Sequence, residues 1–426
     1  MKKRVVITGM GVVAPNGTGV ENFLHSIQNG VSGIRFIEEL KNLNFGCQIG
    51  GIPEFNDSPY LQILEQYGLN GCSKIITLSC IAGLEAWEDA GFQIPERESA
   101  VDYETGIIIG SGIGSADIFG ERIVPLTNEK QIKKLRSTIV EHSMLSGPSA
   151  NLAGILGLGN QITFNSSACS TGTEAILMSF ERIRSGQAIS MIAGAADTYS
   201  PYCWSGFDSM RVLTRKYNEE PEKGSRPMSE SASGFVPGAG AGIIILEEYE
   251  TAIKRNAKIY GEIVGGHINA GGQRSGGTMS APNSEGVIRC IKNAMKDACI
   301  ESKQIDYISG HLSSTMADPI EIKNWTEALG RQGNEFPYIN SLKSMTGHTI
   351  GAAGAIETVA ALLQMNHNFI HPSLNCEDLH PEIKKLVAPE KIPHTTINDI
   401  KIKYLAKSSF GFGDVNACVI IKNLKD

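Results

Sequence analysis

The chain has 426 residues, of which 41% are hydrophobic and 19% are charged, and its formal net charge is −7. This composition is that of a globular enzyme and excludes a disordered chain, and the length allows two domains or one large one. The acidic balance disfavours general nucleic-acid binding, and no apolar run reaches the roughly 20 residues that span a bilayer. We therefore expect neither nucleic acid nor a membrane as a partner.

The first residues predict a strand. Met1-Lys-Lys-Arg faintly resembles the start of a signal peptide, but Gly9 and Gly11 interrupt the apolar run that follows. The nine cysteines lack the spacing of a metal site, so no metal is expected. Because no convincing signal peptide is found, we expect a cytoplasmic protein. The odd number of scattered cysteines then indicates reduced thiols.

Strand-like runs alternate with helical ones along the whole chain, which is typical of an α/β fold. One short helix is expected over Leu61–Asn70. The expected strands are Val5–Ile7, Gly106–Ile109, Met191–Ala193, Ile243–Leu246, Lys258–Val264, Tyr307–Ile308, Lys401–Tyr404 and Ala417–Ile421.

Cys169 lies in a run of small residues, Asn165-Ser-Ser-Ala-Cys-Ser-Thr-Gly-Thr173. The preceding Ile162-Thr-Phe-Asn predicts the end of a buried strand, and Thr173–Ile183 predicts a helix. A thiol at such a turn lies at the positive end of the helix dipole, which lowers its pKa and favours the nucleophilic thiolate. Cys169 is therefore a candidate nucleophile, although an isolated cysteine is more often a buried structural residue.

Two later segments each place a histidine after a strand-like stretch. The first is Gly310-His311-Leu-Ser-Ser-Thr315, and the second is Lys343-Ser-Met-Thr-Gly-His348, which leads into a helix of small residues. Either histidine alone is more often structural than catalytic. With Cys169 they match, in type, order and approximate spacing, the Cys-His-His triad of the β-ketoacyl-acyl carrier protein synthases.

The resemblance to this thiolase-related family covers nearly the whole chain and is closest to its long-chain type II condensing enzymes. A single glycine-rich piece is weak evidence, but several family motifs occur here in the right order. They are the opening strand Val5–Pro15, the acyl-pocket loop Gly110–Gly114, the pocket-gating segment Gly206–Leu213, and the signatures Gly234–Gly242 and Phe410–Asn416.

The resemblance implies a thiolase-like fold of five layers, α-β-α-β-α, made of two pseudo-duplicated halves. The halves would be residues 1–250, which hold the cysteine, and 251–426, which hold both histidines. The implied activity is an acyltransferase reaction, the decarboxylating Claisen condensation of a Cys169-bound acyl group with malonyl-acyl carrier protein. The implied partners are the acyl carrier protein and a second subunit, either identical or a related chain-length subunit. No cofactor is implied beyond the phosphopantetheine arm that the carrier supplies.

The family's catalytic roles transfer to matching positions. Cys169 would accept the acyl group, and the backbone amides of Cys169 and Phe412 would form an oxyanion hole. His311 and His348 would donate Nε2 hydrogen bonds to the malonyl thioester, each kept neutral by a carbonyl or carboxylate partner. Lys343 would support His348. Glu321 would support His311 in the same way.

The substrate-binding positions also follow from the resemblance. Ile113 and Phe207 match residues that line or gate the acyl chain, and Phe410 lies in the last signature beside the gating Phe412. Ser313 and Thr315 match the two hydroxyl residues that bind the phosphopantetheine arm, with Ser313 in place of the usual threonine.

Several residues depart from the family pattern. Leu312 replaces a glycine and would crowd the pantetheine tunnel or shift the backbone. Ala239 replaces a glutamate, and Asp414 replaces a glycine. The Leu61–Asn70 helix lacks the usual cations for an acidic carrier, which leaves a set of candidates elsewhere: Lys133, Lys134, Arg136, Arg211 and Arg215.

These departures spare the triad and favour a specialised synthase of polyenes, aryl polyenes or polyketides. Three alternatives stay open: a housekeeping fatty-acid elongation enzyme, a non-catalytic chain-length or scaffold subunit, and a non-decarboxylating thiolase. The last would need a second cysteine in the Phe410 motif, and none occurs before Cys418. A dinucleotide site at Gly110–Gly114 is disfavoured because the glycine spacing is incomplete.

Overall fold

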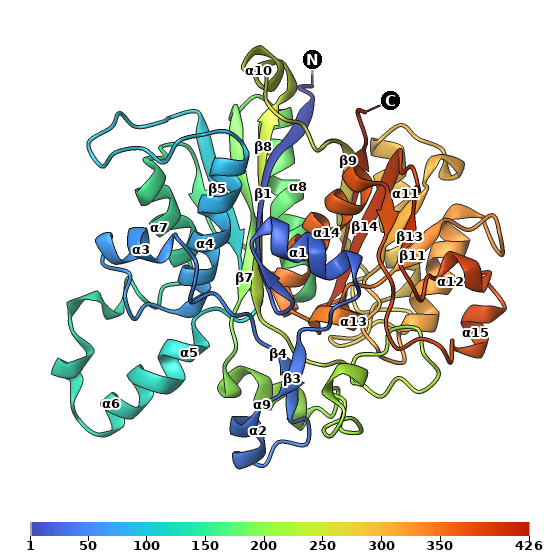
Figure 1. The fold of residues 1–426 in the computed structure, drawn as a ribbon, viewed down its shortest axis with the longest axis horizontal. Coiled ribbons are helices and arrows are strands. Elements are labelled where there is room, and N and C mark those ends of the chain that lie inside the picture. The colour runs from blue at the N-terminus through green and yellow to red at the C-terminus, as the bar shows by residue number, and fades with distance from the viewer. Residues whose placement is uncertain (1, 426) are drawn as a thin grey trace.

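The structure is a computed structural model that describes residues 2–425. The fold is built around a mixed sheet of 11 strands. Ten of them follow one path, β11-β10-β14-β15-β9-β1-β8-β7-β5-β6, and β2 (Gly17–Thr18) pairs with β1. Near the middle of the path, β1 and β9 pair over three residues at Val5–Ile7. Figure 1 shows that this short junction joins two sheets, one on each side of a pair of central helices.

The two sheets repeat the same pairing scheme. In each, the second strand from the outer edge, β5 or β10, pairs in parallel with both of its neighbours. The two strands after these three are antiparallel to their neighbours. The first sheet contains β6 (Ile162–Thr163), β5 (Thr105–Gly110), β7 (Ser190–Asp197), β8 (Gly240–Glu248) and β1 (Val5–Ala14). The second contains β11 (Tyr338–Asn340), β10 (Tyr307–Ser309), β14 (Tyr404–Gly411), β15 (Val415–Lys422) and β9 (Gly261–Ala270).

Helices complete five layers, α-β-α-β-α, from left to right in Figure 1. The first layer is α4 (Lys74–Asp89) with α7 (Gly147–Leu156), the central layer is α8 (Thr171–Arg184) with α14 (Ala353–His367), and the last is α11 (Ser284–Asp297) with α12 (Asp318–Leu329). One apolar cluster packs the central helices against both sheets, and two further clusters fill the interfaces between the sheets and the outer helical layers. The α/β class and the five layers expected from the sequence are confirmed.

The remaining short elements lie around this frame. They are α1 (Val20–Gln28), β3 (Ile34–Phe36), α2 (Glu38–Asn42), β4 (Ile49–Gly51), α3 (Leu61–Gln66), α5 (Ala116–Ile118), α6 (Val124–Asn128), α9 (Pro201–Ser209), α10 (Tyr249–Lys254), α13 (Lys343–Thr346), β12 (Phe369–Ile370), α15 (Pro381–Lys384) and β13 (Ile397–Asn398). Among the described residues, no helix combines the length and the apolar character needed to cross a bilayer.

Most expected strands lie inside observed ones, but some boundaries were wrong. β14 begins at Tyr404 and not at Lys401, because the Asp306 carboxylate binds the backbone N–H groups of Lys403 and Tyr404. β9 begins at Gly261 and not at Lys258. The strand at Ile162 is an edge strand in which that side chain is 43% exposed, so the expected burial is wrong.

The helix expected over residues 61–70 is also shorter than predicted. α3 ends at Gln66, and Gly68 follows with a φ of 73°, a left-handed conformation that glycine adopts without strain. By contrast, the helix expected over Thr173–Ile183 is confirmed and slightly longer, as α8.

Candidate active site

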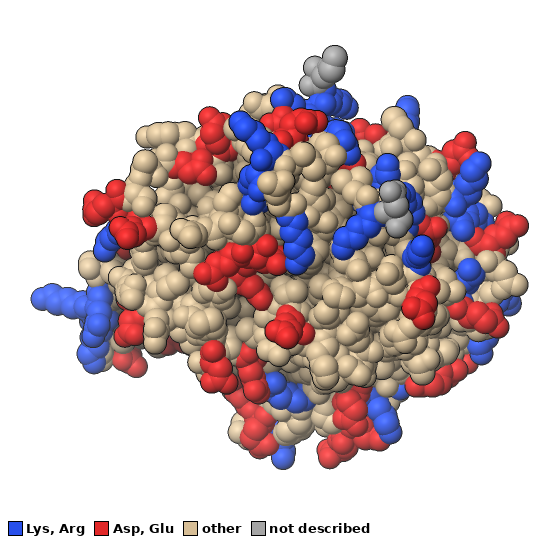
Figure 2. Space-filling view, turned by 45° about the horizontal axis from the view of Figure 1, so that its top comes forward, with Lys and Arg blue, Asp and Glu red and all other residues tan. Residues whose placement is uncertain are grey.

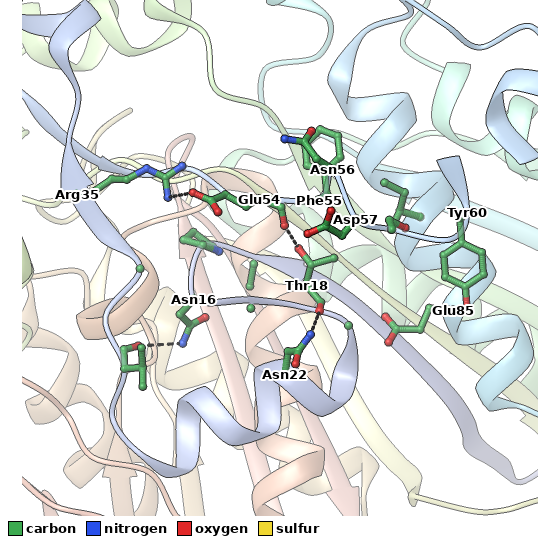
Figure 3. A pocket seen from close by; sticks show the side chains of 18 of the residues that line it. Asn16, Thr18, Asn22, Arg35, Glu54, Phe55, Asn56, Asp57, Tyr60 and Glu85 are labelled. Carbon is green, nitrogen blue, oxygen red and sulfur yellow. Dashed lines mark hydrogen bonds and ion pairs between the residues drawn. The ribbon is translucent and has the colours of Figure 1, made fainter. Parts of the chain in front are cut away.

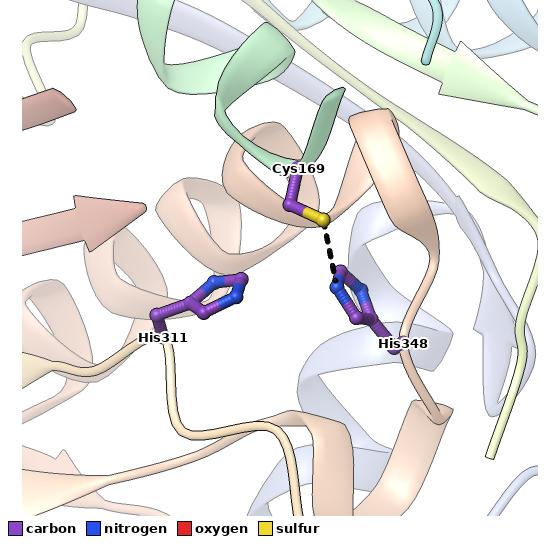
Figure 4. A group of neighbouring side chains, drawn as sticks. All are labelled: Cys169, His311 and His348. Atoms are coloured by element: carbon purple, nitrogen blue, oxygen red, sulfur yellow. Dashed lines mark hydrogen bonds between the residues drawn. The ribbon is translucent and has the colours of Figure 1, made fainter. Parts of the chain in front are cut away.

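The structure brings Cys169, His311 and His348 together, as Figure 4 shows. Cys169 lies in a 3₁₀ turn, Ala168–Ser170, directly before α8, while the two histidines follow β10 and α13. The thiol sulfur and one ring nitrogen of each histidine lie within 4.8 Å of one another. A nucleophile from the first half of the chain therefore meets two imidazoles from the second half.

His348 is oriented to donate a hydrogen bond to the thiol. Its Nδ1 accepts from the backbone N–H of Ile350 at 3.2 Å, and its Nε2 lies 3.2 Å from Cys169 Sγ. An Nδ1 that accepts carries no proton, so the hydrogen bond assigns the proton to Nε2. Burial, with the nearby Lys343 ammonium, lowers the pKa of His348 well below its usual value. The residue is therefore a neutral donor.

His311 is fixed mainly through its backbone. Its N–H donates to Glu321 Oε1 at 2.7 Å, and its carbonyl accepts from Lys343 Nζ at 2.5 Å. Burial, again with Lys343, lowers the pKa of His311 well below its usual value. Its Nδ1 has no hydrogen-bond partner among residues 2–425. The expected carbonyl or carboxylate partner of each imidazole is therefore wrong for both.

The pKa of the Cys169 thiol moves in the direction opposite to the prediction. Burial raises it to about 11, although Lys343 and the Phe412 backbone N–H act to lower it. The helix that begins next to Cys169 supplies a dipole, but removing the thiolate from water costs more than the dipole returns. In the free protein the thiol form therefore predominates at neutral pH.

This raised pKa predicts an unusual alkylation profile. We expect modification of Cys169 by iodoacetamide to keep rising nearly tenfold per pH unit up to about pH 10, because the thiolate fraction is still far from saturation. A thiol with an ordinary pKa levels off from about pH 9. Peptide mapping by mass spectrometry after timed labelling measures the rate, with a small cysteine peptide as the reference. If the labelling rate of Cys169 instead reaches a plateau below about pH 9, the helix dipole lowers the pKa of the thiol and the raised value is wrong.

Two buried carboxylates of α12 hold the loop that carries His311. Glu321 accepts the backbone N–H groups of His311 and Leu312 at 2.7 and 2.8 Å. Asp318 accepts those of Ser313 and Ser314 at 2.8 and 3.0 Å. Glu321 thus lies beside His311 as expected, and burial raises its pKa to about 7. Asp318 was not predicted, although it lies within the same motif.

Lys343 is 1% exposed, which excludes an ordinary surface lysine. Its ammonium binds the His311 carbonyl and the Glu357 carboxylate, so its direct contact is with His311. In addition to burial, its charge also lowers the pKa of His348, in agreement with the electrostatic support expected from the sequence. Sequence reasoning also missed Asp197, at the end of β7. Its carboxylate accepts N–H groups from Gly112 and Gly351, which fixes the acyl-pocket loop beside the start of the central helix α14.

A cavity of about 370 Å³ opens onto the three side chains. Of the predicted substrate-binding residues it includes Phe207, Ser313, Thr315 and Phe410, together with Phe412. Apolar residues that the sequence analysis did not single out also line it, among them Val212, Phe235, Val287, Ile320 and Ile350. Ile113 does not line this cavity but packs against its wall, in the apolar cluster that contains Phe207 and Ile350. Its role in acyl binding stays a prediction.

Leu312 does not crowd the cavity, contrary to expectation. Its side chain is fully buried in the apolar cluster between the second sheet and the last helical layer. Ser341 Oγ donates to its carbonyl at 2.8 Å, which helps to fix the loop with the side chain turned into the core. This replacement of glycine therefore leaves the path to Cys169 open.

Asp414 fixes a loop at the cavity mouth. It is fully buried, and its two carboxylate oxygens accept the N–H groups of Gln273 and Asn283 at 2.8 and 2.7 Å. The loop between these residues contributes Ser275, Gly276, Ser280, Ala281 and Pro282 to the cavity lining. Ala239 is buried away from the lining residues, and its N–H donates to Gly51.

A second cavity, of about 730 Å³, lies on the other side of the opening strand, between the start of α1 and the loop before α3 (Figure 3). Polar groups line it, including Asn16, Thr18, Glu54 and Glu85. Neither Cys169 nor the two histidines lie in it. This second cavity is larger than the cavity at Cys169, but it is not part of the candidate active site.

Comparisons with known proteins identify the class. The N-terminal domain of the beta-ketoacyl synthases matches residues 2–252, and their C-terminal domain matches residues 260–377. The chain belongs to the beta-ketoacyl synthase family. It is accordingly an acyltransferase of that family.

Particular relatives cover the chain from end to end. It is 34% identical to 3-oxoacyl-[acyl-carrier-protein] synthase 2 of Vibrio harveyi and to synthase 1 of Escherichia coli K12, each match covering 100% of both chains. A type II polyketide ketosynthase, solved in complex with its acyl-carrier protein, superposes with a TM-score of 0.88 at 30% identity over 100% of both chains. A beta-ketoacyl synthase from Burkholderia phymatum STM815 superposes with a TM-score of 0.88 at 28% identity, covering 99% of this chain and 100% of the other.

Proposed function

We propose that the protein catalyses the decarboxylating Claisen condensation of a Cys169-bound acyl group with malonyl-acyl carrier protein. The product is a 3-oxoacyl-acyl carrier protein. One observation carries the proposal: a thiol and two neutral imidazoles meet within 4.8 Å at an apolar cavity. This arrangement combines a nucleophile with two donors for a thioester oxygen, as the reaction requires.

The first stage transfers the acyl group to the enzyme. Cys169 Sγ attacks the carbonyl carbon of the incoming thioester, the bond to the carrier's sulfur breaks, and the thiol proton ends on the released carrier arm. The Cys169 and Phe412 amides are the expected donors to the tetrahedral oxyanion. The Phe412 N–H lies close enough to the sulfur to favour its thiolate, which supports this placement.

The second stage forms the carbon–carbon bond. Malonyl thioester loses CO₂, and the electron pair of the broken bond becomes an enolate whose oxygen accepts hydrogen bonds from His311 and His348. The enolate carbon attacks the acyl carbonyl, and the Cys169 thiolate leaves and regains a proton from solvent. Both imidazoles must stay uncharged and protonated at the nitrogen that faces the cavity, which their burial favours.

The carrier is an acyl carrier protein in this proposal, because relatives of the chain are named as 3-oxoacyl-[acyl-carrier-protein] synthases, and one relative was solved in complex with its acyl-carrier protein. Ser313 and Thr315 line the cavity with their hydroxyls 3.1 Å apart, where a pantetheine arm would pass. Figure 2 shows basic and acidic side chains interspersed over one face of the molecule. The five basic candidates for docking, Lys133, Lys134, Arg136, Arg211 and Arg215, are all exposed and stay predictions.

We further assign the enzyme to a specialised polyene, aryl polyene or polyketide pathway. Asp414, which departs from the family pattern, fixes a loop that lines the cavity, while the triad is kept. The polyketide ketosynthase among the structural relatives is compatible with this assignment. The 34% identity to bacterial 3-oxoacyl synthases 1 and 2 favours the second candidate, housekeeping fatty-acid elongation.

A panel of acyl carriers separates these candidates. We expect condensation with malonyl carrier to be at least about tenfold faster, in kcat/KM, for polyunsaturated or polyketide chains than for the saturated series from hexanoyl to palmitoyl. Such a ratio corresponds to about 1.4 kcal/mol of differential transition-state binding. Mass spectrometry of the carrier-bound products measures the rates. Equal rates along the saturated series would favour the housekeeping role, and no product with any chain would favour a non-catalytic subunit.

A second subunit, identical or related, is part of the proposal. β6 is an edge strand of the first sheet, and its Ile162 side chain is exposed. Such an edge pairs readily with another chain. A solved ketosynthase/chain length factor assembly superposes on this chain with a TM-score of 0.87 at 25% identity.

A further inference from the structure

A second lysine is buried behind the active site, in addition to Lys343. Lys407 lies on β14 and is fully buried, with its Nζ 2.9 Å from Glu357 Oε2. This contact is an ion pair between two buried groups. Lys407 also donates to the Ser408 carbonyl and to Ser409 Oγ.

The Lys343–Glu357–Lys407 cluster holds more positive than negative charge. Glu357 Oε1 already binds Lys343, so a single lysine suffices to neutralise this carboxylate. A further buried ammonium costs several kcal/mol unless other interactions offset it. The molecule carries this cost directly behind two imidazoles that must stay uncharged, which points to a role in the reaction and not in folding.

Lys407 also connects the elements that carry the reactive groups. Its partner Ser409 Oγ lies 2.9 Å from Thr173 Oγ1 on α8, the helix that begins beside Cys169. The Ser409 carbonyl accepts from Ser170 Oγ at 3.1 Å. β14 then continues directly into the Phe410–Phe412 segment that lines the cavity. Displacing Lys407 would therefore affect both sides of the oxyanion hole.

The ionisable groups around the imidazoles come from several elements. Lys343 of α13 and Lys407 of β14 act on both rings, and His348 also acts on His311. Cys169, with Asp318 and Glu321 of α12, lines the same cavity. Glu357 of α14 pairs with both lysines, and Asp197 at the end of β7 acts on Cys169. Both lysines act to lower the pKa of each histidine. Burial lowers the pKa of Lys407 itself, while Glu357 acts to keep its proton in place.

We propose that Lys407 is a positioning residue for the condensation, which acts through its charge to keep His311 and His348 uncharged and through Glu357 and Ser409 to hold the oxyanion loop. The effect of Lys407 on the condensation rate rests on the proposed function. Its effect on the protonation of the two histidines does not depend on any reaction. The rate and the histidine protonation can therefore be tested separately.

The decisive variant is Lys407→Met, which removes the charge and keeps the length of the side chain. Without this cation the pKa of each imidazole rises toward its ordinary value, so both become protonated at higher pH. For Lys407→Met, we expect the acidic limb of the pH–rate profile of condensation to shift to higher pH by about one unit. At a given pH on that limb, the rate then falls about tenfold. Lys407→Arg retains the charge and is expected to keep the limb of the wild type.

Histidine titration by NMR on ¹³C-labelled full-length protein gives the readout that needs no activity. Lys403→Met is the matched control, since Lys403 is an exposed cation just before the same strand. A mere packing role would impair Lys407→Met at every pH and leave the histidine titration unchanged, which would overturn the proposal. An equal shift in Lys407→Arg and Lys407→Met would overturn it as well.

A second variant and a second readout cover the cases in which Lys407→Met does not fold or the wild type is inactive. If Lys407→Met fails to fold, as judged by near-UV circular dichroism, Lys407→Gln replaces it because its amide still donates to Ser408 and Ser409. If the wild type forms no condensation product, the proposed function fails, and the histidine titration alone decides the role of Lys407.

Discussion

Cys169→Ala is expected to abolish acylation of the protein. In the wild type, incubation with an acyl-loaded carrier should add the mass of one acyl group, because Cys169 is the thiol that faces both imidazoles in the cavity. The alanine variant has no nucleophile there and should gain no mass. Intact-protein mass spectrometry measures the fraction of acylated protein. We expect this fraction to be near complete for the wild type and at background for Cys169→Ala.

Cys299→Ala is the matched control, since Cys299 is the exposed cysteine among the nine. It should be acylated like the wild type. A mass gain that persists in Cys169→Ala would show that another residue accepts the acyl group. A wild type that takes up no acyl group from any carrier would favour the non-catalytic subunit, and co-purification of a partner would then be the next experiment.

Loss of either imidazole is expected to suppress decarboxylation of malonyl carrier, by on the order of 100- to 1000-fold for each of His311→Gln and His348→Gln. The reason is the loss of one donor to the enolate oxygen. His311→Gln should still form the acyl-enzyme. His348→Gln should also slow acylation, because Nε2 of His348 is the group that contacts Cys169 Sγ at 3.2 Å. Release of labelled CO₂ and the mass gain measure the two stages separately.

His371→Gln serves as the control for removing a buried imidazole. This residue is also fully enclosed, with a pKa lowered by burial to about 4, but its ring contacts the Pro372 carbonyl and does not line the cavity. Decarboxylation should stay close to that of the wild type. Undiminished CO₂ release in both cavity variants would refute the donor roles.

The fold and the meeting of the three reactive side chains were predictable because they depend on local motifs in a fixed order. Cys169 lies in a 3₁₀ turn directly before α8, His311 follows β10, and His348 follows α13. Ala168 takes a φ of 48°, and this left-handed turn presents Cys169 at the start of α8.

What the sequence could not predict depends on burial and on partners distant in the chain. The pKa of Cys169 was predicted from a helix terminus alone, and desolvation reversed the direction. Leu312 was expected to crowd the pantetheine tunnel or to shift the backbone. The carboxylate of Glu321 accepts its backbone N–H, and its side chain lies in the core and not in the tunnel. Lys407 and Glu357 are 50 residues apart in the sequence, and no local pattern indicates that they pair.

The repeated pairing scheme of the two sheets divides the reactive groups between the two halves of the chain. Cys169 comes from the first half, whereas His311, His348 and Phe412 come from the second. The site therefore exists only where the two halves meet. We expect neither half alone to carry out either stage of the proposed reaction, and a change at the contact between the halves to impair both stages.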